Sequence, residues 1–171
     1  MSPIEQDAVA AYDHFDPSFE VPLVQQHYGI ASSGLDVTFD LGTALFFATH
    51  SLGWTADGKG QDTAIPGDEI SGVVYCLKFT DPPLRSTSAM VTELGIFDKY
   101  PPLRPLRQSC ALPDFDSLAI NEAMADTDAI LVLEKHFDSS GIPTVTDLFP
   151  SPEDDPFYKV LLDAKAAYKV S

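Results

Sequence analysis

The clearest structural pattern in the chain lies at Leu35–Leu52, LDVTFDLGTALFFATHSL. Its first residues, Leu35–Phe39, alternate between apolar and polar types and are β-rich, so they predict a short strand. Asp40 follows, a residue type that caps helices well, and apolar residues then recur at helical spacing through Ala48. This segment therefore predicts a strand that leads into a helix buried over most of its circumference.

The rest of the chain mixes strands and helices without the regular spacing of βαβ units. Further strands are predicted at Ile70–Phe79, Leu106–Leu112 and Ala129–Phe137, with a helix left open for the last. Further helices are predicted at Glu5–Tyr12, at Val21–Tyr28 and, with Asp155 as its cap, at Pro156–Val170. Loops or extended segments are predicted at Gly53–Asp68, Tyr100–Pro105 and Thr144–Phe149. The predicted fold class is α+β, a single domain with a small, mostly antiparallel sheet and flanking helices.

The charge balance limits the classes of partner. The 171 residues suit one domain and carry 26 acidic against 10 basic residues, a formal net charge of −16. No Lys or Arg precedes Lys59. Nucleic acids and anionic membranes are bound largely through clustered Lys and Arg, so direct binding to either is not expected. A basic protein partner fits this charge, and so does an acidic surface that serves only solubility.

Cysteine and histidine spacing indicates no metal site. Cys76 and Cys110 form no CxxC motif, and the four histidines show no HxH or HxxxH spacing, so we expect no metal. The first eleven residues have neither the basic nor the apolar region of a signal peptide. No apolar stretch approaches the roughly 20 residues that span a bilayer. We therefore expect a cytoplasmic protein.

Three stretches, taken in order, resemble the FRG domain family. They are Gln26–Ala48 (QHYGIASSGLDVTFDLGTALFFA), Arg104–Leu112 (RPLRQSCAL) and Asp147–Pro150 (DLFP). Members of that family show a Gln-His-Tyr-Gly motif before a helix ending in Ala-Leu-Phe-Phe-Ala, then an Arg…Gln-x-Gly-x-Phe segment and a Leu-Phe-Pro motif. The resemblance implies an FRG-like domain of uncharacterised function at residues 21–171, after an acidic N-terminal segment at residues 1–20.

The chain departs from the family pattern at several positions. Val37 stands where Trp is usual and Cys110 where Gly is usual, while Ser32 and Ser33 replace the expected Thr and Arg. The Phe-Arg-Gly element that names the family lies upstream of the Gln-His-Tyr-Gly motif, and no arginine precedes Gln26 here. The missing element indicates either a fragment or a domain trimmed at its N-terminus, or a domain that has lost this element.

A more distant likeness to the ADP-ribosyltransferase fold implies a cleft that binds a nucleotide such as NAD. The residues expected to line it are His27, Tyr28, Asp36, Thr38, Arg104 and Gln108. His27 would hydrogen-bond a ribose hydroxyl, Tyr28 would stack on the nicotinamide ring, and Arg104 with Arg107 would pair with the pyrophosphate. The structural alternative is that the first two residues end a helix and that the arginines pair with surface carboxylates.

Asp36, Thr38 and Gln108 can likewise be interpreted either as ligand-binding residues or as structural residues. Asp36 and Thr38 share one face of the predicted strand, and a carboxylate beside a hydroxyl can hold a sugar or orient a base. The alternative is hydrogen bonding at a strand end. Gln108 would share a strand face with Arg104, but an amide cannot act as a general base, which weakens any catalytic role.

Two functions from different classes therefore remain open. The first is an FRG-type domain with a nucleotide-binding, transferase-like cleft. The second is a non-catalytic acidic module that binds a basic protein partner. The Gln-His-Tyr-Gly motif favours the first, whereas the missing upstream arginine and the net charge of −16 favour the second.

Overall fold

The computed structural model describes residues 24, 26–28, 35–54, 60–64, 72–78, 87–91, 101–115, 126–134 and 136–168. The helices in this part of the chain are α3 (Leu41–Thr49), α4 (Leu103–Arg107), α5 (Val145–Leu148) and α6 (Pro156–Tyr168). The strands are β1 (Val37–Thr38), β2 (His50–Trp54), β3 (Gly60–Ala64), β4 (Val73–Leu77), β5 (Thr87–Val91), β6 (Cys110–Phe115) and β7 (Thr127–Val132). The chain is thus an α+β protein, as predicted.

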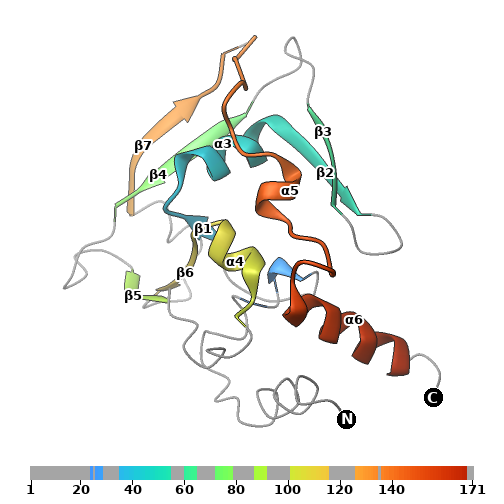
Figure 1. Ribbon diagram of the computed structural model, residues 1–171. Helices are drawn as coiled ribbons and strands as arrows, with labels where there is room; N and C mark the ends of the chain where they lie inside the picture. The colour runs from blue at the N-terminus through green and yellow to red at the C-terminus, as the bar shows by residue number, and fades with distance from the viewer. Residues whose placement is uncertain are drawn as a thin grey trace.

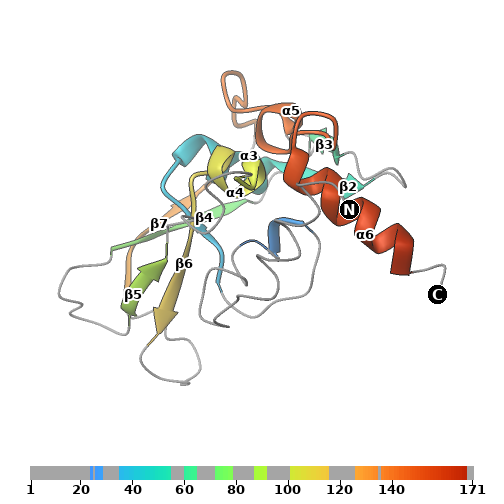
Figure 2. The ribbon, with the colours of Figure 1, turned by 60° about the horizontal axis from the view of Figure 1, so that its bottom comes forward.

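The strands in the described ranges pair antiparallel in three small sheets. One sheet has the order β1-β6-β5, and the other two are the pairs β2–β3 and β4–β7. In Figure 1, α3 crosses in front of β4, with the β2–β3 hairpin on its other side. Figure 2 shows β5 and β6 running side by side, well away from α6. Helix α3 therefore lies between the β4–β7 pair and the β2–β3 hairpin.

Helix α3 occupies the centre of this arrangement. A carboxylate oxygen of Asp40 accepts hydrogen bonds from the backbone N–H of Thr43 at 2.7 Å and from its hydroxyl at 2.8 Å, which caps the helix. Phe46 is fully buried and packs with Leu148 and Phe149 at the end of α5. The predicted cap and helix are confirmed, and this helix joins the middle of the chain to its C-terminal part.

A second apolar cluster ties the N-terminal Gln-His-Tyr segment to α6. Val24 and Tyr28 pack against Phe157 and Tyr158, with the tyrosine rings 5.2 Å apart between centroids. Asp155 is fully buried, and its Oδ1 accepts the backbone N–H of Tyr158 at 3.2 Å. The predicted cap of this helix is therefore confirmed.

Other predicted elements are confirmed with shifted bounds. The strand predicted at Ile70–Phe79 is β4, and the one predicted at Ala129–Phe137 is β7, which begins two residues earlier and ends at Val132. The described residues of the helix predicted at Val21–Tyr28 are helical at 24, 26 and 27. The helix predicted at Glu5–Tyr12 lies outside the described residues.

Three local predictions are wrong. The loop predicted at Gly53–Asp68 contains the end of β2 and the whole of β3, because the two strands pair as a hairpin. The segment Thr144–Phe149 forms α5 rather than extended chain, since the side chains and backbone N–H groups of Thr144 and Asp147 bond reciprocally as a capping box.

The third error concerns the segment around Gln108. Leu103–Arg107 forms α4, so the segment predicted as loop or extended at Tyr100–Pro105 is helical from Leu103, and the strand predicted at Leu106–Leu112 begins only at Cys110. Pro105 is tolerated because the first turn of a helix leaves its N–H groups without intrahelical partners. The chain reverses at Ser109, which has a φ of 48° and follows the helix C-cap, a position that glycine often occupies. Arg104 and Gln108 therefore do not share a strand face.

Candidate functional site

A groove of about 900 Å³ runs between α3 with β1 on one side and the β4–β7 pair on the other. Most of its lining is apolar: Leu35, Val37, Phe39, Leu41, Ala44, Phe47, Ala48, Val73, Val74, Tyr75, Cys76, Leu77 and Cys110. The polar lining residues are Asp36, Thr38, Asp40, Thr43, Gln108 and Thr127. A large apolar hollow with a few convergent polar groups is the usual form of a binding site.

Strand pairing brings polar residues of the groove wall close to Cys110. Thr38 lies directly opposite Cys110 in the β1–β6 pair. Asp36 precedes Thr38 by two residues, so it points to the same face and is a diagonal neighbour of Cys110. Asp36 and Thr38, which the sequence predicts to share one face of the strand, both line the groove.

His27 approaches Asp36 from the N-terminal segment. Its Nε2 lies 3.3 Å from Oδ2 of Asp36, and its side chain is almost fully buried. The Asp36 side chain is 41% exposed. Burial raises the pKa of Asp36, while the neighbouring His27 acts in the opposite direction. The structure thus brings two of the six predicted site residues, His27 and Asp36, into contact, and Asp36 shares the groove wall with Thr38 and Gln108.

Gln108 lines the groove as well, but its polar groups and the Thr38 hydroxyl form hydrogen bonds between separate elements of the fold. The Thr38 hydroxyl donates to the carbonyl of Gln108 at 2.6 Å and accepts the backbone N–H of Asp40 at 3.0 Å. The side-chain amide of Gln108 donates to the carbonyl of Leu148 at 3.1 Å. These bonds join β1, α4 and α5, which gives both residues a structural role at the groove wall.

Tyr28 and Arg104 lie in the core rather than in the groove. The Arg104 residue is only 1% exposed, and its guanidinium lies 3.8 Å from the ring centroid of Tyr158 and 5.1 Å from that of Tyr28. One guanidinium nitrogen donates to the carbonyl of His27 at 3.2 Å. Burial lowers the pKa of Arg104. The geometry gives these two residues a packing role and presents neither to a ligand in the groove.

Arg107 also contributes to chain packing. Its guanidinium donates to the carbonyls of Thr146 and Asp147 at 3.3 and 3.4 Å. The arginines expected to hold a pyrophosphate thus bond to backbone carbonyls, and none of the described residues that line the groove is Lys, Arg or His. A pyrophosphate in this groove would have no cation from its lining.

Cys110 is a site residue that the sequence did not reveal. One nitrogen of His27, one carboxylate oxygen of Asp36 and Sγ of Cys110 all lie within 4.8 Å of one another. Burial, and secondarily the charge of Asp36, raises the pKa of Cys110, so its thiol is not an activated nucleophile. The sequence did not indicate that Cys110 lies near Asp36 and His27, because this proximity depends on the pairing of β1 with β6. The first residue of β6 could not be determined from the sequence.

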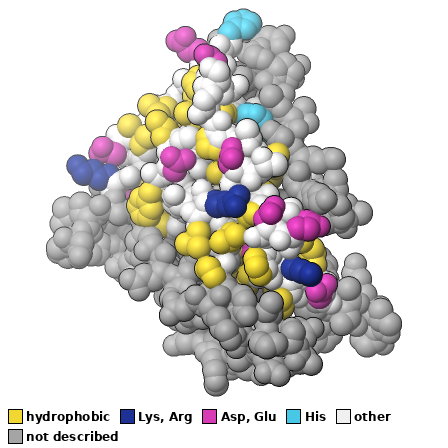
Figure 3. All heavy atoms as spheres, in the orientation of Figure 1, with side chains coloured by type: hydrophobic (Ala, Val, Ile, Leu, Met, Phe, Trp, Pro, Cys, Tyr) yellow, Lys and Arg dark blue, Asp and Glu magenta, His cyan; other side chains and the backbone are white. Residues whose placement is uncertain are grey.

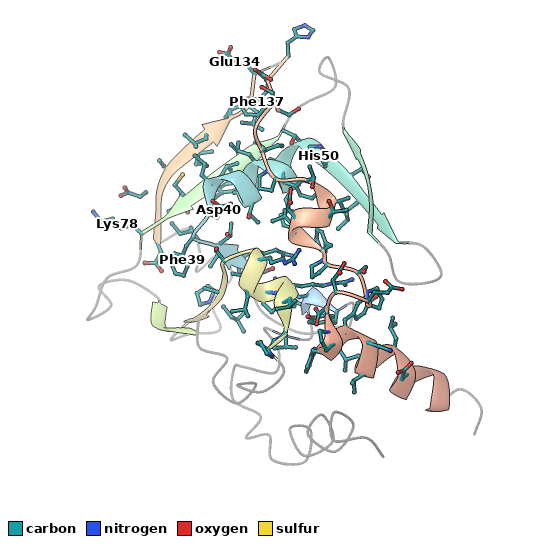
Figure 4. All side chains as sticks on the ribbon, viewed as in Figure 1. Phe39, Asp40, His50, Lys78, Glu134 and Phe137 are labelled. Atoms are coloured by element: carbon teal, nitrogen blue, oxygen red, sulfur yellow. The ribbon has the colours of Figure 1, made fainter. Side chains whose placement is uncertain are left out.

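Apolar side chains are also exposed along the groove and beside it. Figure 3 shows such side chains over α3, α4 and β7 on one face of the molecule. Phe39, Leu41, Phe47 and Tyr75 line the groove and are each about half exposed or more. Figure 4 places Phe39 and Asp40 at the start of α3, with His50 at its far end. Exposed apolar groups that gather in this way mark binding surfaces.

Comparison with protein-family models, curated proteins and solved structures finds no match to this chain. The fold and the site therefore rest on the geometry described above.

None of the helices in the described part of the chain is both long enough and apolar enough to cross a bilayer.

Proposed function

We propose that this chain is a non-catalytic interaction module whose groove binds an apolar, positively charged segment of a partner protein. The observation that carries this proposal is the composition of the groove wall. The wall is mainly apolar and includes the carboxylates of Asp36 and Asp40, and none of its described residues is basic. Such a wall is complementary to a segment that combines an apolar face with Lys or Arg side chains.

The apolar side chains would supply most of the affinity. Phe39, Phe47 and Tyr75 are 67%, 47% and 56% exposed, so a partner can remove much of their surface from water. Full burial of a large apolar side chain contributes about 1.5–3 kcal/mol. An amphipathic helix laid in an apolar groove uses this kind of contact and is a common mode of peptide recognition.

Charge would speed the encounter and select the partner. The chain carries a formal net charge of −16, which attracts a basic segment from a distance and repels an acidic one. Because exposed charges are screened by salt, binding through this groove should weaken as the ionic strength rises.

The proposal is tested with two synthetic amphipathic helical peptides of equal length. Both carry the same leucine face, and the opposite face carries lysine in one and glutamate in the other. Fluorescence anisotropy measures the affinity of each peptide at low and high salt. We expect saturable binding of the lysine peptide that weakens with salt. Equal affinity for both peptides would contradict the role of charge, and no binding of either would contradict the proposal.

Matched variants locate the binding to the groove. Phe47 and Leu106 are both helix residues and are 47% and 48% exposed, but only Phe47 lines the groove. We expect Phe47→Ala and Tyr75→Ala to weaken binding of the lysine peptide by about tenfold each, and Leu106→Ala to leave it unchanged. An equal loss in Leu106→Ala would place the binding outside the groove.

The second candidate is an FRG-like domain that binds a nucleotide such as NAD. It is supported by the contact of His27 with Asp36, which lines the groove together with Thr38. It is further supported by contacts among the three stretches that carry the FRG resemblance, such as the bond from Gln108 to the carbonyl of Leu148. It is weakened by the burial of Arg104.

A thermal-shift titration with NAD, nicotinamide and ADP-ribose tests this second candidate. A ligand at a hundredfold excess over its dissociation constant adds about 2.7 kcal/mol of stability if it binds only the folded state. A saturable rise in Tm that is lost in Asp36→Asn would favour the nucleotide site. No shift at millimolar ligand would leave the interaction module as the better account.

A further inference from the structure

His27, Asp36 and Cys110 come from three separate segments and meet beside the groove, which Asp36 and Cys110 line. His27 belongs to the N-terminal helical segment, Asp36 precedes β1, and Cys110 begins β6. Their nitrogen, oxygen and sulfur donor atoms all lie within 4.8 Å of one another. We propose that these three residues bind a zinc ion, a role that goes beyond the proposed interaction with a partner.

The spacing of the donors fits a tetrahedral ion. Zinc binds histidine nitrogen at about 2.0–2.1 Å and carboxylate oxygen at about 2.0–2.2 Å, so two such ligands at a tetrahedral angle lie about 3.3–3.5 Å apart. The observed distance from His27 Nε2 to Asp36 Oδ2 is 3.3 Å. A thiolate at about 2.3 Å from the ion would lie about 3.5–3.6 Å from the other donors. Sγ of Cys110 is within 4.8 Å of both, so a small side-chain adjustment closes the site.

The protein holds two of the ligands in place before any ion arrives. The carbonyl of His27 accepts a hydrogen bond from the buried Arg104, and Cys110 is paired with Thr38 across β1 and β6. His27 and Cys110 are buried, whereas Asp36 is partly exposed. The exposed carboxylate provides an entry path, and three protein ligands leave a fourth position open toward the groove.

The mixture of donors selects the kind of metal. Imidazole and thiolate suit zinc and similar borderline ions, whereas Mg²⁺ and Ca²⁺ prefer sites made only of oxygen. Three protein ligands with one open position are typical of zinc sites that also bind water or another group. The nitrogen donor of His27 and the sulfur donor of Cys110 therefore distinguish this cluster from an ordinary group of surface carboxylates.

Titration of the reduced full chain with Co²⁺, followed by Zn²⁺, tests the proposal. Tetrahedral cobalt shows intense visible bands, and a bound thiolate adds a charge-transfer band in the near ultraviolet. We expect both bands to appear with saturation at one ion per chain and to disappear when Zn²⁺ displaces the cobalt. The absence of saturable binding, or weak octahedral bands alone, would overturn the proposal.

Variants assign the ligands. Cys110→Ser should remove the charge-transfer band, and Asp36→Asn should weaken Zn²⁺ binding by about tenfold or more. Cys76→Ser is the matched control, because Cys76 is the other free cysteine and also lines the groove. This control should bind as the wild type does. A charge-transfer band that persists in Cys110→Ser, or that vanishes in Cys76→Ser, would overturn the assignment.

A second readout separates ligand loss from misfolding. Asp36→Asn changes a partly exposed side chain, so its circular dichroism and Tm without metal should match those of the wild type. Zn²⁺ should raise the Tm of the wild type and of Cys76→Ser by mass action. A rise of the same size in a folded Asp36→Asn would show that the ion binds elsewhere and would refute the proposal.

Discussion

The hydroxyl of Tyr28 donates a hydrogen bond to Oδ2 of Asp155 at 2.5 Å, across 127 positions of the sequence. Both side chains are buried, and the backbone N–H of Arg104 donates to the same hydroxyl at 3.4 Å. Asp155 also caps α6 through the N–H of Tyr158. One buried bond therefore fixes the N-terminal segment, which supplies His27, to the last helix of the chain.

Removal of the Tyr28 hydroxyl should destabilise the protein. Tyr28→Phe keeps the ring contacts with Phe157 and Tyr158 but leaves the buried carboxylate of Asp155 with one donor fewer. We expect a loss of about 1–3 kcal/mol in the free energy of unfolding, measured with urea. Tyr75→Phe, at an exposed tyrosine, is the control and should change stability by less than about 0.5 kcal/mol. Equal stability of the two variants would contradict the structural role of the bond.

The burial of Asp155 should make stability depend on pH. Burial raises its pKa above the ordinary value of 3.8, against the hydrogen bonds from Tyr28 and Tyr158. The folded state then binds the proton more tightly than the unfolded state does. The stability from this group is therefore full below the unfolded pKa and is lost as the pH rises through the folded pKa.

Asp155→Asn keeps the cap and removes this titration. We expect the free energy of unfolding of the variant to increase relative to that of the wild type as the pH rises from about 4 to 7, so the variant gains relative stability. Urea unfolding at a series of pH values measures the difference. A difference that stays constant with pH, or that changes in the opposite direction, would show that the carboxyl is not penalised by burial.

The cap of α3 gives a test at the start of the central helix. Asp40→Ala should lower the free energy of unfolding by about 1 kcal/mol because the N–H of Thr43 loses its acceptor, whereas Asp40→Asn should keep most of the cap. The bonds from Thr43 lower the pKa of Asp40. The wild type should therefore lose part of this advantage over Asp40→Ala as the pH falls below 3.8 toward the lowered pKa. An alanine variant as stable as the wild type would contradict this role.

Gly72 is required where β4 passes the end of α3. A Cβ at this position would lie 2.4 Å from the carbonyl oxygen of Ala48 and 3.0 Å from a methyl group of Leu133. The carbonyl of Gly72 also accepts the N–H of Leu133 at 2.9 Å, so the backbone cannot shift freely. We expect Gly72→Ala to cost about 1–3 kcal/mol, measured by thermal or urea unfolding. A change below about 0.5 kcal/mol would show that β4 can move away from the helix.

Elements whose signals lie within a few residues could be predicted. The cap at Asp40, the cap at Asp155 and the apolar run of β4 depend on local hydrogen bonding and periodicity, and all three were found in the expected places. The helix α5 has a local signal as well, the capping box of Thr144 and Asp147, but the β-branched residues around it favoured extended chain.

The candidate site was only partly predictable, because its geometry depends on the exact end of α4. The reversal at Ser109 determines which residue begins β6 and therefore which side chain lies opposite Thr38. A strand register that differs by one residue turns every side chain to the other face. Asp36 and Thr38 could be placed on one face from alternation alone, whereas the approach of Cys110 could not.

The sequence by itself determined the α+β class, the caps of the two long helices and the acidity of the chain, because these follow from neighbouring residues and from composition. Only the tertiary structure decided that Arg104 is a core residue, stacked on tyrosine rings from distant segments. It also decided that His27, Asp36 and Cys110 meet at one point. Both results come from packing between segments far apart in the chain, and such contacts leave no periodic pattern in the sequence.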